Sequence, residues 1–367
     1  MKNPFIYGSV VTGEYFVDRE NEIKDLSASL LAGQHVLMLS PRKMGKSSLI
    51  EETFRRTNEK DGVIALRIDM WKTPNMESFA KEIVNRLISA SYTSVEKFLH
   101  DSIDLFKRIR PRIYVDAGGS IGVEFDLAEK RVLLEEAMEL PERIAVKKGK
   151  RIILAFDEFQ EIARFDGIET EKFLRSVIQA QKNVSYIFSG SEQSMLSLMF
   201  GDATRPFYRF ARIMKLEPIK ESILVEFINS RFKKSRKAID AEAAKWIAAF
   251  SEGAPSYVQQ ICHETWNLNS IVDMDVVKTA MDNAISSMDA GFRTIWENIS
   301  SNEQRVLLIA LAKEGAAKIY SSGFIKKYDL KSPGHVRKAI KLLENMRLVE
   351  NNRPSDFFFR EWLRRTY

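Results

Sequence analysis

A short polar stretch at residues 40 to 48 has the residue types and spacing of a phosphate-binding loop. The usual pattern is a glycine, four free positions and then Gly-Lys-Ser or Gly-Lys-Thr. The chain keeps the second half of this pattern in Gly45, Lys46 and Ser47, while Ser40 stands where the first glycine belongs. The predicted contact residues are Ser40, Pro41, Arg42, Lys43, Met44, Gly45, Lys46, Ser47 and Ser48.

The surrounding sequence favours a phosphate site over a basic turn that merely precedes a helix. An apolar run ends at Leu39, and an apolar helical face begins at Leu49, which is the strand-to-helix context that the motif requires. Lys46 would reach the β- and γ-phosphates of a nucleotide, and the Ser47 hydroxyl would hold Mg²⁺. Because Ser40 lacks the freedom of glycine, we expect it to fit only if the turn uses ordinary dihedral angles.

Two adjacent carboxylates, Asp157 and Glu158, follow a second apolar run. In parallel α/β sheets, ligands bind at the carboxyl ends of the strands. Asp157 is therefore predicted to orient Mg²⁺ or its bound water, and Glu158 to polarise the water that attacks the γ-phosphate. The alternative is an acidic pair at a strand end that takes part in no chemistry.

A parallel sheet is expected to position these residues, because β-rich runs alternate with helical patterns over the first 220 residues. Most of these runs are apolar on both faces, as strands covered by helices on both sides are. An insertion at 92–140 carries a hairpin signal with its turn at 117–120. The predicted strands cover residues 35–40, 63–69, 151–157, 184–190 and 212–219.

Composition narrows the class of protein. A chain of 367 residues with 45% hydrophobic and 29% charged residues predicts two or three globular domains. The single cysteine, Cys262, excludes an internal disulfide, and the four histidines do not have metal-ligand spacing, so a zinc centre is not expected. The apolar runs are too short to cross a membrane, and the N-terminus lacks a secretory signal, so we expect a cytoplasmic protein.

Several stretches, taken in order, resemble the archaeal and bacterial branch of AAA+ ATPases related to the STAND NTPases. They are FVDRENEI, SPRKMGKSS, RIILAFDEFQEI, IFSGSEQSM, RPFYRFARIMKLEPI and EGAPSYVQQICHETW. The resemblance implies an α/β P-loop NTPase fold of the AAA+ type with a parallel five-stranded sheet, an all-helical lid and a C-terminal winged helix. The implied domains cover 1–220, 221–290 and 291–367, with ATP or ADP and Mg²⁺ as cofactors held between sheet and lid.

The resemblance also implies roles for further residues. It places Phe16, Val17 and Arg19 in the adenine pocket, and Pro255 of the lid against the adenine. A serine at the end of the fourth strand, Ser189 or Ser191, would bind the γ-phosphate or the attacking water. Related sequences vary at the arginine that neutralises charge in the transition state, and among Arg205, Arg209 and Arg212 we favour Arg212 because it lies next to the fifth predicted strand. Each residue also has an alternative role that involves no nucleotide. Phe16 would be a core residue, the two serines would form hydrogen bonds at a strand end, Pro255 would start a helix, and the arginine would form a surface ion pair.

The last 67 residues carry the positive charge of the chain, with 14 lysines and arginines against 7 aspartates and glutamates. Ser332 and Pro333 are predicted to start a helix whose buried face holds Val336, Ile340, Leu343 and Met346. Four basic side chains on this helix would then face solvent, as they do on a helix that enters the major groove of DNA. Lys326 and Lys327 would contact the DNA phosphates. A winged helix used for packing or protein contact is the alternative. The predicted DNA-contacting residues are His335, Arg337, Lys338 and Lys341.

Together these features predict an ATP-dependent molecular switch in which hydrolysis resets the orientation of a basic winged helix. Two alternatives stay open: a nucleotide-gated DNA-binding regulator with negligible turnover, and a signalling scaffold whose winged helix binds a protein partner. The expected partners are ATP and either double-stranded DNA or a protein, with no membrane. Salt dependence separates DNA from protein, because phosphate contacts weaken steeply with salt.

Overall fold

The computed structural model describes residues 2–58, 62–108, 111–115, 121–125 and 130–367. The chain divides into two compact units. One unit comprises residues 10–217, and the other combines residues 1–9 with residues 218–367. The expected helical and winged-helix regions therefore belong to a single unit, which also contains the first nine residues.

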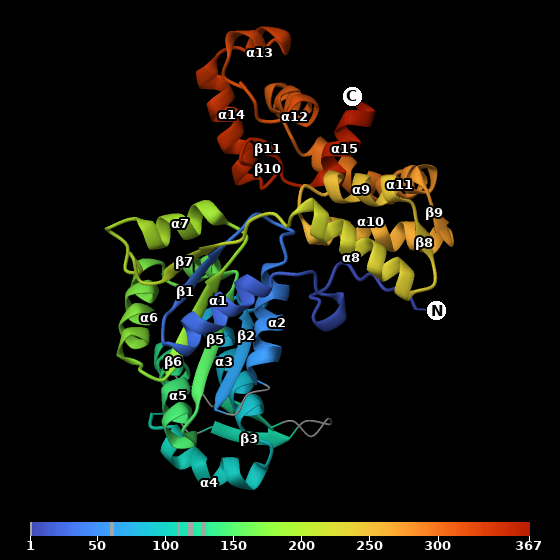
Figure 1. Ribbon diagram of the computed structural model, residues 1–367. Coiled ribbons are helices and arrows are strands. Elements are labelled where there is room, and N and C mark those ends of the chain that lie inside the picture. Colours follow the sequence, from blue (N-terminus) through green and yellow to red (C-terminus); the bar gives the residue numbers. More distant parts are fainter. Residues whose placement is uncertain (1, 59–61, 109–110, 116–120, 126–129) are drawn as a thin grey trace. The chain divides into compact units, whose positions relative to one another are not determined.

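A five-stranded parallel sheet forms the centre of the unit 10–217 (Figure 1). Its order is β2-β5-β6-β1-β7, and every neighbouring pair is parallel. The prediction of a parallel five-stranded P-loop sheet is confirmed. The strands are β1 (Val36–Leu39), β2 (Val63–Asp69), β5 (Arg151–Asp157), β6 (Val184–Ser189) and β7 (Arg212–Lys215).

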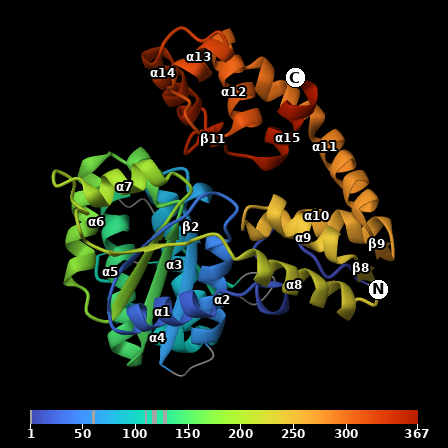
Figure 2. The ribbon, with the colours of Figure 1, turned by 45° about the horizontal axis from the view of Figure 1, so that its top comes forward.

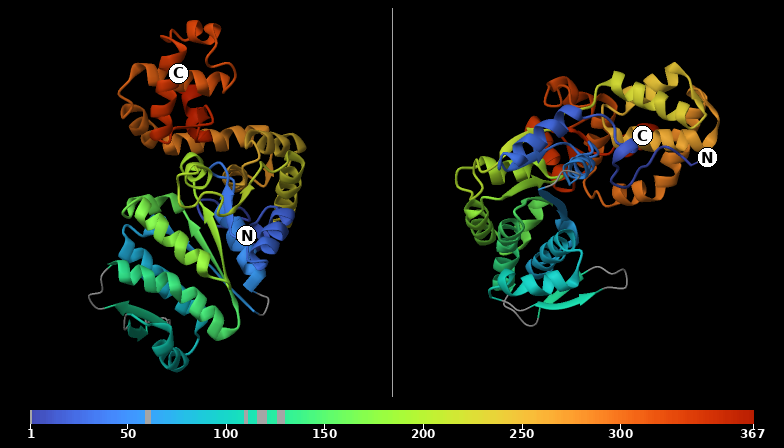
Figure 3. Two further views of the ribbon diagram at one scale, coloured as in Figure 1. Left: turned by 90° about the vertical axis from the view of Figure 1, so that its left-hand side faces the viewer. Right: turned by 60° about the horizontal axis from the view of Figure 1, so that its bottom comes forward.

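Helices cover both faces of this sheet, as Figures 2 and 3 also show. Alternate side chains of β5 point to opposite faces, so Leu154 and Phe156 enter one core while Ile153 and Ala155 enter the other. The first core is completed by α3 (Met76–Ser91), α5 (Lys130–Lys148), α6 (Ile168–Ala180) and α7 (Gln193–Gly201). The second is completed by α1 (Glu20–Leu31) and α2 (Lys46–Asn58). Burial on both faces explains why the strands are continuous apolar runs.

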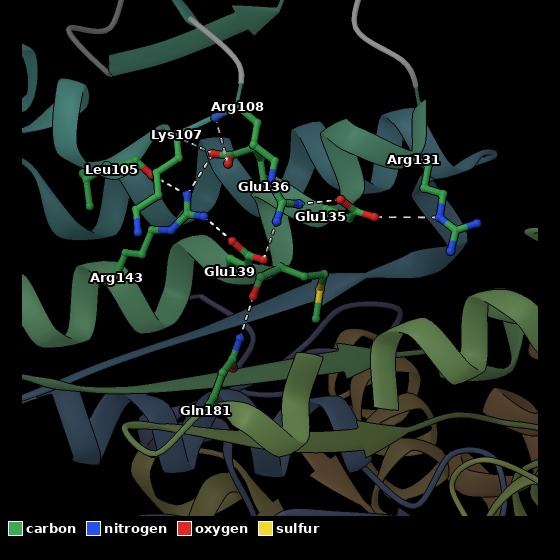
Figure 4. A network of polar contacts seen from close by, with 10 residues as sticks. Leu105, Lys107, Arg108, Arg131, Glu135, Glu136, Glu139, Arg143 and Gln181 are labelled. Atoms are coloured by element: carbon green, nitrogen blue, oxygen red, sulfur yellow. Dashed lines mark hydrogen bonds and ion pairs between the residues drawn. The ribbon is translucent and has the colours of Figure 1, made fainter. Parts of the chain in front are cut away.

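The predicted insertion forms α4 (Val95–Leu105) and an antiparallel hairpin of β3 (Pro111–Val115) and β4 (Ile121–Phe125). Its expected turn at 117–120 lies outside the described residues. The fully buried Glu136 of α5 anchors the insertion (Figure 4). Its carboxylate accepts hydrogen bonds from the backbone N–H groups of Lys107 (3.1 Å) and Arg108 (3.2 Å) and from Arg143 (2.9 Å). Arg143 also donates to the Leu105 carbonyl at 2.7 Å.

Short 3₁₀ helices complete the unit 10–217. They are η1 (Gly13–Tyr15), η2 (Met70–Lys72) and η3 (Phe159–Arg164). The last of these follows the two predicted site carboxylates directly, so the chain turns sharply after β5.

The second unit is mainly helical, as predicted, but residues 221–290 also contain a two-residue parallel pair of strands. Ala238 pairs with Ile271, and Ile239 pairs with Val272. The helix α11 runs through the expected domain boundary at residue 290 (Figure 2). The elements are α8 (Glu221–Lys234), β8 (Ala238–Ile239), α9 (Ala241–Phe250), α10 (Pro255–Leu268), β9 (Ile271–Val272) and α11 (Met274–Glu297).

The winged helix follows as three helices, a strand pair and a closing helix. Its elements are α12 (Asn302–Glu314), α13 (Ser322–Lys327), α14 (Pro333–Asn345), β10 (Val349–Glu350), β11 (Arg353–Pro354) and α15 (Phe357–Thr366). Tyr257 of α10 stacks on Phe357 of α15 with ring centroids 4.3 Å apart. Glu252 forms ion pairs with Arg353 (3.1 Å) and Arg360 (2.7 Å). These contacts and the unbroken α11 join the helical region to the winged helix as one body.

The first nine residues pack within the same unit. Phe5 is buried against Phe227 and Phe232 of α8, with ring centroids 6.2 and 5.2 Å away. The backbone N–H of Ile6 donates to Gln259 of α10 at 3.1 Å. Across the described residues, no helix combines the length and apolar character needed to span a membrane.

The sheet rests on a cluster of aromatic rings centred on Phe188, the residue before Ser189. Its ring centroid lies 4.7 Å from that of Phe159, 5.2 Å from that of Phe200 and 5.5 Å from that of Phe207. All of these rings are buried. The cluster therefore fixes the end of β6 from the side opposite α1 and α2.

Phe188→Ala should lower the free energy of unfolding by about 3–5 kcal/mol, because it removes a large buried ring and leaves a cavity. Urea unfolding of the full chain, followed by circular dichroism, measures this. Ile213→Ala is the matched control, since Ile213 lies in β7 and is 53% exposed. Equal losses in the two variants would contradict a central role for the cluster.

Candidate nucleotide site

The predicted site residues gather at the carboxyl edge of the sheet. The loop 40–45 leaves β1 and enters α2, while Asp157 ends β5 and Ser189 ends β6. The register pairs Met38 with Ser189 and Phe156 with Phe188, so these strand ends are level. The topology therefore brings together residues that are more than 100 positions apart in the sequence.

The loop makes its turn without a glycine at position 40. Lys43 and Gly45 adopt positive φ values of 66° and 82°, whereas Ser40 does not. This meets the condition under which serine was expected to fit. Lys46 is buried, and its ammonium group donates to the Ser40 carbonyl at 3.3 Å. The loop is thus closed by its own lysine.

Asp157 is the centre of the site's hydrogen bonds. Its Oδ2 accepts from the Ser47 hydroxyl at 2.7 Å and from Arg67 Nη1 at 2.9 Å. Its Oδ1 accepts from the Ser189 hydroxyl at 2.7 Å and from the Glu158 backbone N–H at 3.2 Å. The predicted metal residues, Ser47 and Asp157, are therefore in direct contact, and Ser189 joins them.

Arg67 of β2 was not among the predicted site residues. Its guanidinium bridges Asp157 and Glu51, since Nε donates to Glu51 at 2.8 Å. Burial alone would lower the pKa of Arg67, but the hydrogen bond and charge of Glu51, together with Asp157, outweigh it and raise the pKa. A charged residue in the middle of an apolar strand was the sequence signal that could have revealed it.

Glu158 is held by three donors on one oxygen. Oε2 accepts from the Ser191 backbone N–H (3.1 Å), the Ser191 hydroxyl (2.8 Å) and Gln160 Nε2 (2.5 Å). Glu158 itself has a left-handed backbone with φ of 56°. Of the two serines that the sequence left open, Ser189 thus supports Asp157 and Ser191 supports Glu158. Gln160, like Arg67, is a site residue that was not predicted.

The residues predicted for the base pocket lie near the loop. Val17 is buried, and Phe16 packs on the core formed with α1 and α2. Arg19 is also buried, and its Nη2 donates to the carbonyls of Met44 (3.2 Å) and Glu217 (3.1 Å). Arg19 therefore ties the loop to the last residue of this unit, and its role beside a base stays a prediction.

The stretch just before these residues is attached to α2. The backbone N–H of Val11 donates to the Ser48 hydroxyl at 3.1 Å, and that of Gly13 donates to Glu52 at 2.8 Å. Glu52 is buried and also pairs with Arg55 and Arg56. The Arg55 hydrogen bond, with help from the Gly13 N–H and Arg56, lowers the pKa of Glu52 to about 2. This carboxylate therefore stays charged at neutral pH and keeps its hydrogen bond to the Gly13 N–H.

The structure does not bring Arg212 to the other site residues. Arg212 pairs in register with Val36, at the opposite, amino-terminal edge of the sheet. Its guanidinium binds Asp25 at 2.8 Å and Ser29 at 2.6 Å. This is the surface ion pair that the sequence left as an alternative, and the geometry gives no support to a role in its own chain's site. Arg205 forms an ion pair with the buried Glu171.

Pro255 lies in the other unit as the first residue of α10. Gly253 before it has φ of 79°, and a Cβ there would lie 2.4 Å from Pro218 Cβ and 2.9 Å from the Ile219 backbone nitrogen. The Ile219 N–H donates to the Gly253 carbonyl at 3.0 Å. Gly253 thus permits a close backbone approach and Pro255 starts a helix, and contact with an adenine stays a prediction.

In the winged helix, α14 has the two faces that were predicted. Ser332 caps it, and Val336, Ile340 and Leu343 are buried. The prediction that Met346 belongs to the buried face is wrong, because Met346 follows the helix as its C-cap and is 40% exposed. Lys326 is exposed, and Lys327 forms an ion pair with Glu314. The predicted DNA-contacting residues His335, Arg337, Lys338 and Lys341 are all exposed.

The sheet order and the loop define a P-loop ATPase fold, and comparison with known families agrees. The chain belongs to the family described as an ATPase domain predominantly from Archaea, whose model matches residues 16–261. A probable winged helix domain matches residues 290–365. The relation to STAND NTPases stays a prediction.

Individual proteins similar to this chain share a quarter or less of its residues over the aligned parts. An uncharacterised ATP-binding protein of Pyrococcus horikoshii is 25% identical over 252 residues, which cover 66% of this chain and 73% of that protein. Among solved structures, the Walker-type ATPase of Pyrococcus abyssi has a TM-score of 0.71 at 20% identity, covering 98% of this chain and 99% of its own. The Aeropyrum pernix ORC2 protein, solved in ADPNP-ADP complexes, has a TM-score of 0.61 at 13% identity, covering 99% and 96%. These structures show the fold.

The site geometry predicts that a side chain at Gly190 would collide with Gln160. A Cβ at Gly190 would lie 2.0 Å from Gln160 Oε1, so Gly190→Ala must displace the amide that holds Glu158. The expected loss in unfolding free energy is about 1–3 kcal/mol, as for other overpacked positions. Urea unfolding measures it.

Gly201→Ala is the control for this substitution, because no atom lies within 4 Å of a Cβ at Gly201. If Gln160 is the obstacle, Gln160→Ala should recover part of the stability lost by Gly190→Ala. The absence of any such recovery would show that the crowding has another source.

Proposed function

We propose that the protein binds and hydrolyses ATP and acts as a molecular switch that contacts double-stranded DNA through its winged helix. The observation that carries the nucleotide part is the 2.7 Å hydrogen bond between Ser47 and Asp157, with Lys46 and Glu158 directly beside them in the sequence. Family membership and the ATP-binding relative support it.

The residues at this edge fit a magnesium–ATP complex. Magnesium prefers hard oxygen ligands, and the site offers a hydroxyl and a carboxylate in contact. Ser47 and Asp157 would hold Mg²⁺, which when bound neutralises charge on the phosphates. The loop 40–48 would surround the phosphates, and Lys46 would exchange its bond to the Ser40 carbonyl for phosphate oxygens.

Glu158 would act on the attacking water. Its carboxylate would accept a proton from the water as the oxygen bonds to the γ-phosphorus, and the bond from this phosphorus to the ADP oxygen would break. The three hydrogen bonds to Oε2 fix the carboxylate's orientation for this transfer. The products are ADP and phosphate. ATP as fuel agrees with a cytoplasmic location, which remains part of the proposal.

Lys46→Ala should weaken binding of magnesium–ATP by one to two orders of magnitude, about 1.4–2.8 kcal/mol, because a buried positive charge facing the phosphates is lost. Isothermal titration calorimetry measures this. Lys182→Ala is the control, since Lys182 is exposed and precedes β6 at the opposite edge of the sheet. Unchanged affinity in Lys46→Ala would remove the loop from the proposed site.

The DNA part of the proposal rests on the exposed basic face of α14. His335, Arg337, Lys338 and Lys341 lie on one helix whose other face is buried in the winged helix. A helix of this kind can enter a major groove while lysines contact phosphates. The Aeropyrum pernix ORC1 protein, solved in complex with DNA, has a similar fold, with a TM-score of 0.53 at 12% identity over 96% of this chain and 94% of its own.

The switch requires that nucleotide state favours one arrangement of the chain over another. The helical region is joined to the winged helix by α11, by the ring stack of Tyr257 and by the ion pair of Glu252. A movement of the helical region would therefore carry α14 with it. Two candidate functions remain beside this one. A nucleotide-gated DNA-binding regulator would show the same coupling with negligible turnover, and a signalling scaffold would bind a protein through α14.

Glu158→Gln keeps the shape of the side chain but removes its basicity, so ATP should bind while turnover falls by about 10²-fold or more. In this variant, DNA affinity should differ between the ATP and ADP forms by roughly 5- to 150-fold, the usual range of allosteric coupling. Fluorescence anisotropy with labelled duplex DNA at low salt measures it.

The control for the DNA contact is a matched pair of lysines. Lys338→Ala with Lys341→Ala should weaken DNA binding in both nucleotide states, while Lys233→Ala with Lys234→Ala on α8 removes the same charge from exposed positions outside the winged helix. Equal DNA affinity in the ATP and ADP forms would contradict the coupling. No binding at low salt would favour the protein-binding scaffold.

A further inference from the structure

The Asp157 carboxylate has no acceptor position left over for another donor. A carboxylate offers about four lone-pair sites on its two oxygens. These are matched by the Ser47 and Ser189 hydroxyls, the Glu158 N–H and the Arg67 guanidinium. A water bound to Mg²⁺ could reach Asp157 only if one of these donors gave way.

Three of the four donors belong to the backbone or to short serine side chains close to it. Ser47 lies in the first turn of α2, Ser189 ends β6, and the Glu158 N–H belongs to the next residue in the chain. Arg67 differs because it reaches Asp157 through a long side chain from β2. It also has a second carboxylate, Glu51, at 2.8 Å from its Nε, which can keep the guanidinium when Asp157 is taken.

Charge selects the same donor. A divalent cation at Ser47 and Asp157 would repel a guanidinium that lies 2.9 Å from the same oxygen. The hydroxyls and the N–H group carry no net charge and face no such repulsion. In the absence of the cation, the guanidinium supplies the positive charge that the buried Asp157 needs.

We propose that Arg67 is a positioning residue that competes with Mg²⁺ for Asp157, and that Glu51 retains its guanidinium when magnesium–nucleotide binds. This inference rests on the proposed nucleotide site and adds its metal dependence. It makes Arg67 a resident counter-charge of the site, which sets how much Mg²⁺ is needed before Asp157 can support the metal.

The test is the Mg²⁺ concentration at which binding of a ribose-labelled fluorescent ATP analogue is half-maximally tightened. Arg67→Met keeps the stem but removes the charge, so about fivefold to tenfold less Mg²⁺ should suffice. Glu51→Gln removes the second partner and should raise the requirement. Arg86→Met, on the exposed surface of α3, is the control and should leave it unchanged. An unchanged or higher requirement in Arg67→Met overturns the proposal.

A second measurement needs no nucleotide. In EDTA, the urea stabilities of Arg67→Met, Asp157→Asn and the double variant form a double-mutant cycle. If Arg67 is the counter-charge of Asp157, the double variant should be about as stable as Asp157→Asn alone, whereas additive losses overturn the proposal. Arg67→Lys, which keeps the charge, covers the case in which Arg67→Met does not fold.

The two measurements separate this inference from the function on which it rests. If the wild-type protein binds no ATP at any Mg²⁺ concentration, the proposed function fails, and the cycle in EDTA still decides whether Arg67 balances Asp157. If ATP binds and only the Mg²⁺ requirement is insensitive to Arg67, the proposed function stands and the inference fails.

Discussion

The contacts of the buried Asp157 carboxylate hold together the elements that form the nucleotide site. The carboxylate joins the first turn of α2 through Ser47, the end of β6 through Ser189 and the middle of β2 through Arg67. Ser47 and Asp157 lie 110 residues apart in the sequence. A charge so deeply buried is tolerated only when it is paired and hydrogen-bonded. The requirement to satisfy one carboxylate therefore aligns loop, sheet and helix at the same edge.

The second unit is organised by a different constraint, which is mechanical continuity. The helix α11 crosses from the helical region into the winged helix without a break, and the Tyr257–Phe357 stack and the Glu252 ion pairs close the remaining gap. A winged helix attached through a flexible linker would not share the orientation of the region before it. This unit is built so that its two regions share one orientation.

Much of this was predictable from residue patterns. Strands buried on both faces are uniformly apolar, so all five were found within a few residues of their ends, and the polar residues that follow them had to meet at one edge. Helix α14 was predictable for a similar reason, since a capped helix with one apolar face allows few alternatives. Its end was less clear, and Met346 lies outside the buried face because the helix stops before it.

The features that were not predicted depend on contacts that a sequence pattern does not reveal. Arg67 interrupts an apolar strand, and its partner Asp157 lies 90 residues away, so only the fold reveals the pair. Gln160 acquires its role from the bare backbone of Gly190. Arg212 was favoured for its nearness to a strand, and as the first residue of a parallel strand it lies at the edge opposite the site of its own chain. The short β8–β9 pair has only two residues per strand, too few for a period to appear.

The assignment of residues 1–9 to the C-terminal unit has a consequence for biosynthesis. Phe5 leaves the ribosome before its packing partners Phe227 and Phe232, which are made more than 200 residues later. At a synthesis rate of about 5–20 residues per second, this segment waits on the order of ten to forty seconds for its binding surface. The nucleotide unit can fold during that interval while residues 2–9 stay unpaired, and only the completion of α8 and α10 lets these residues dock.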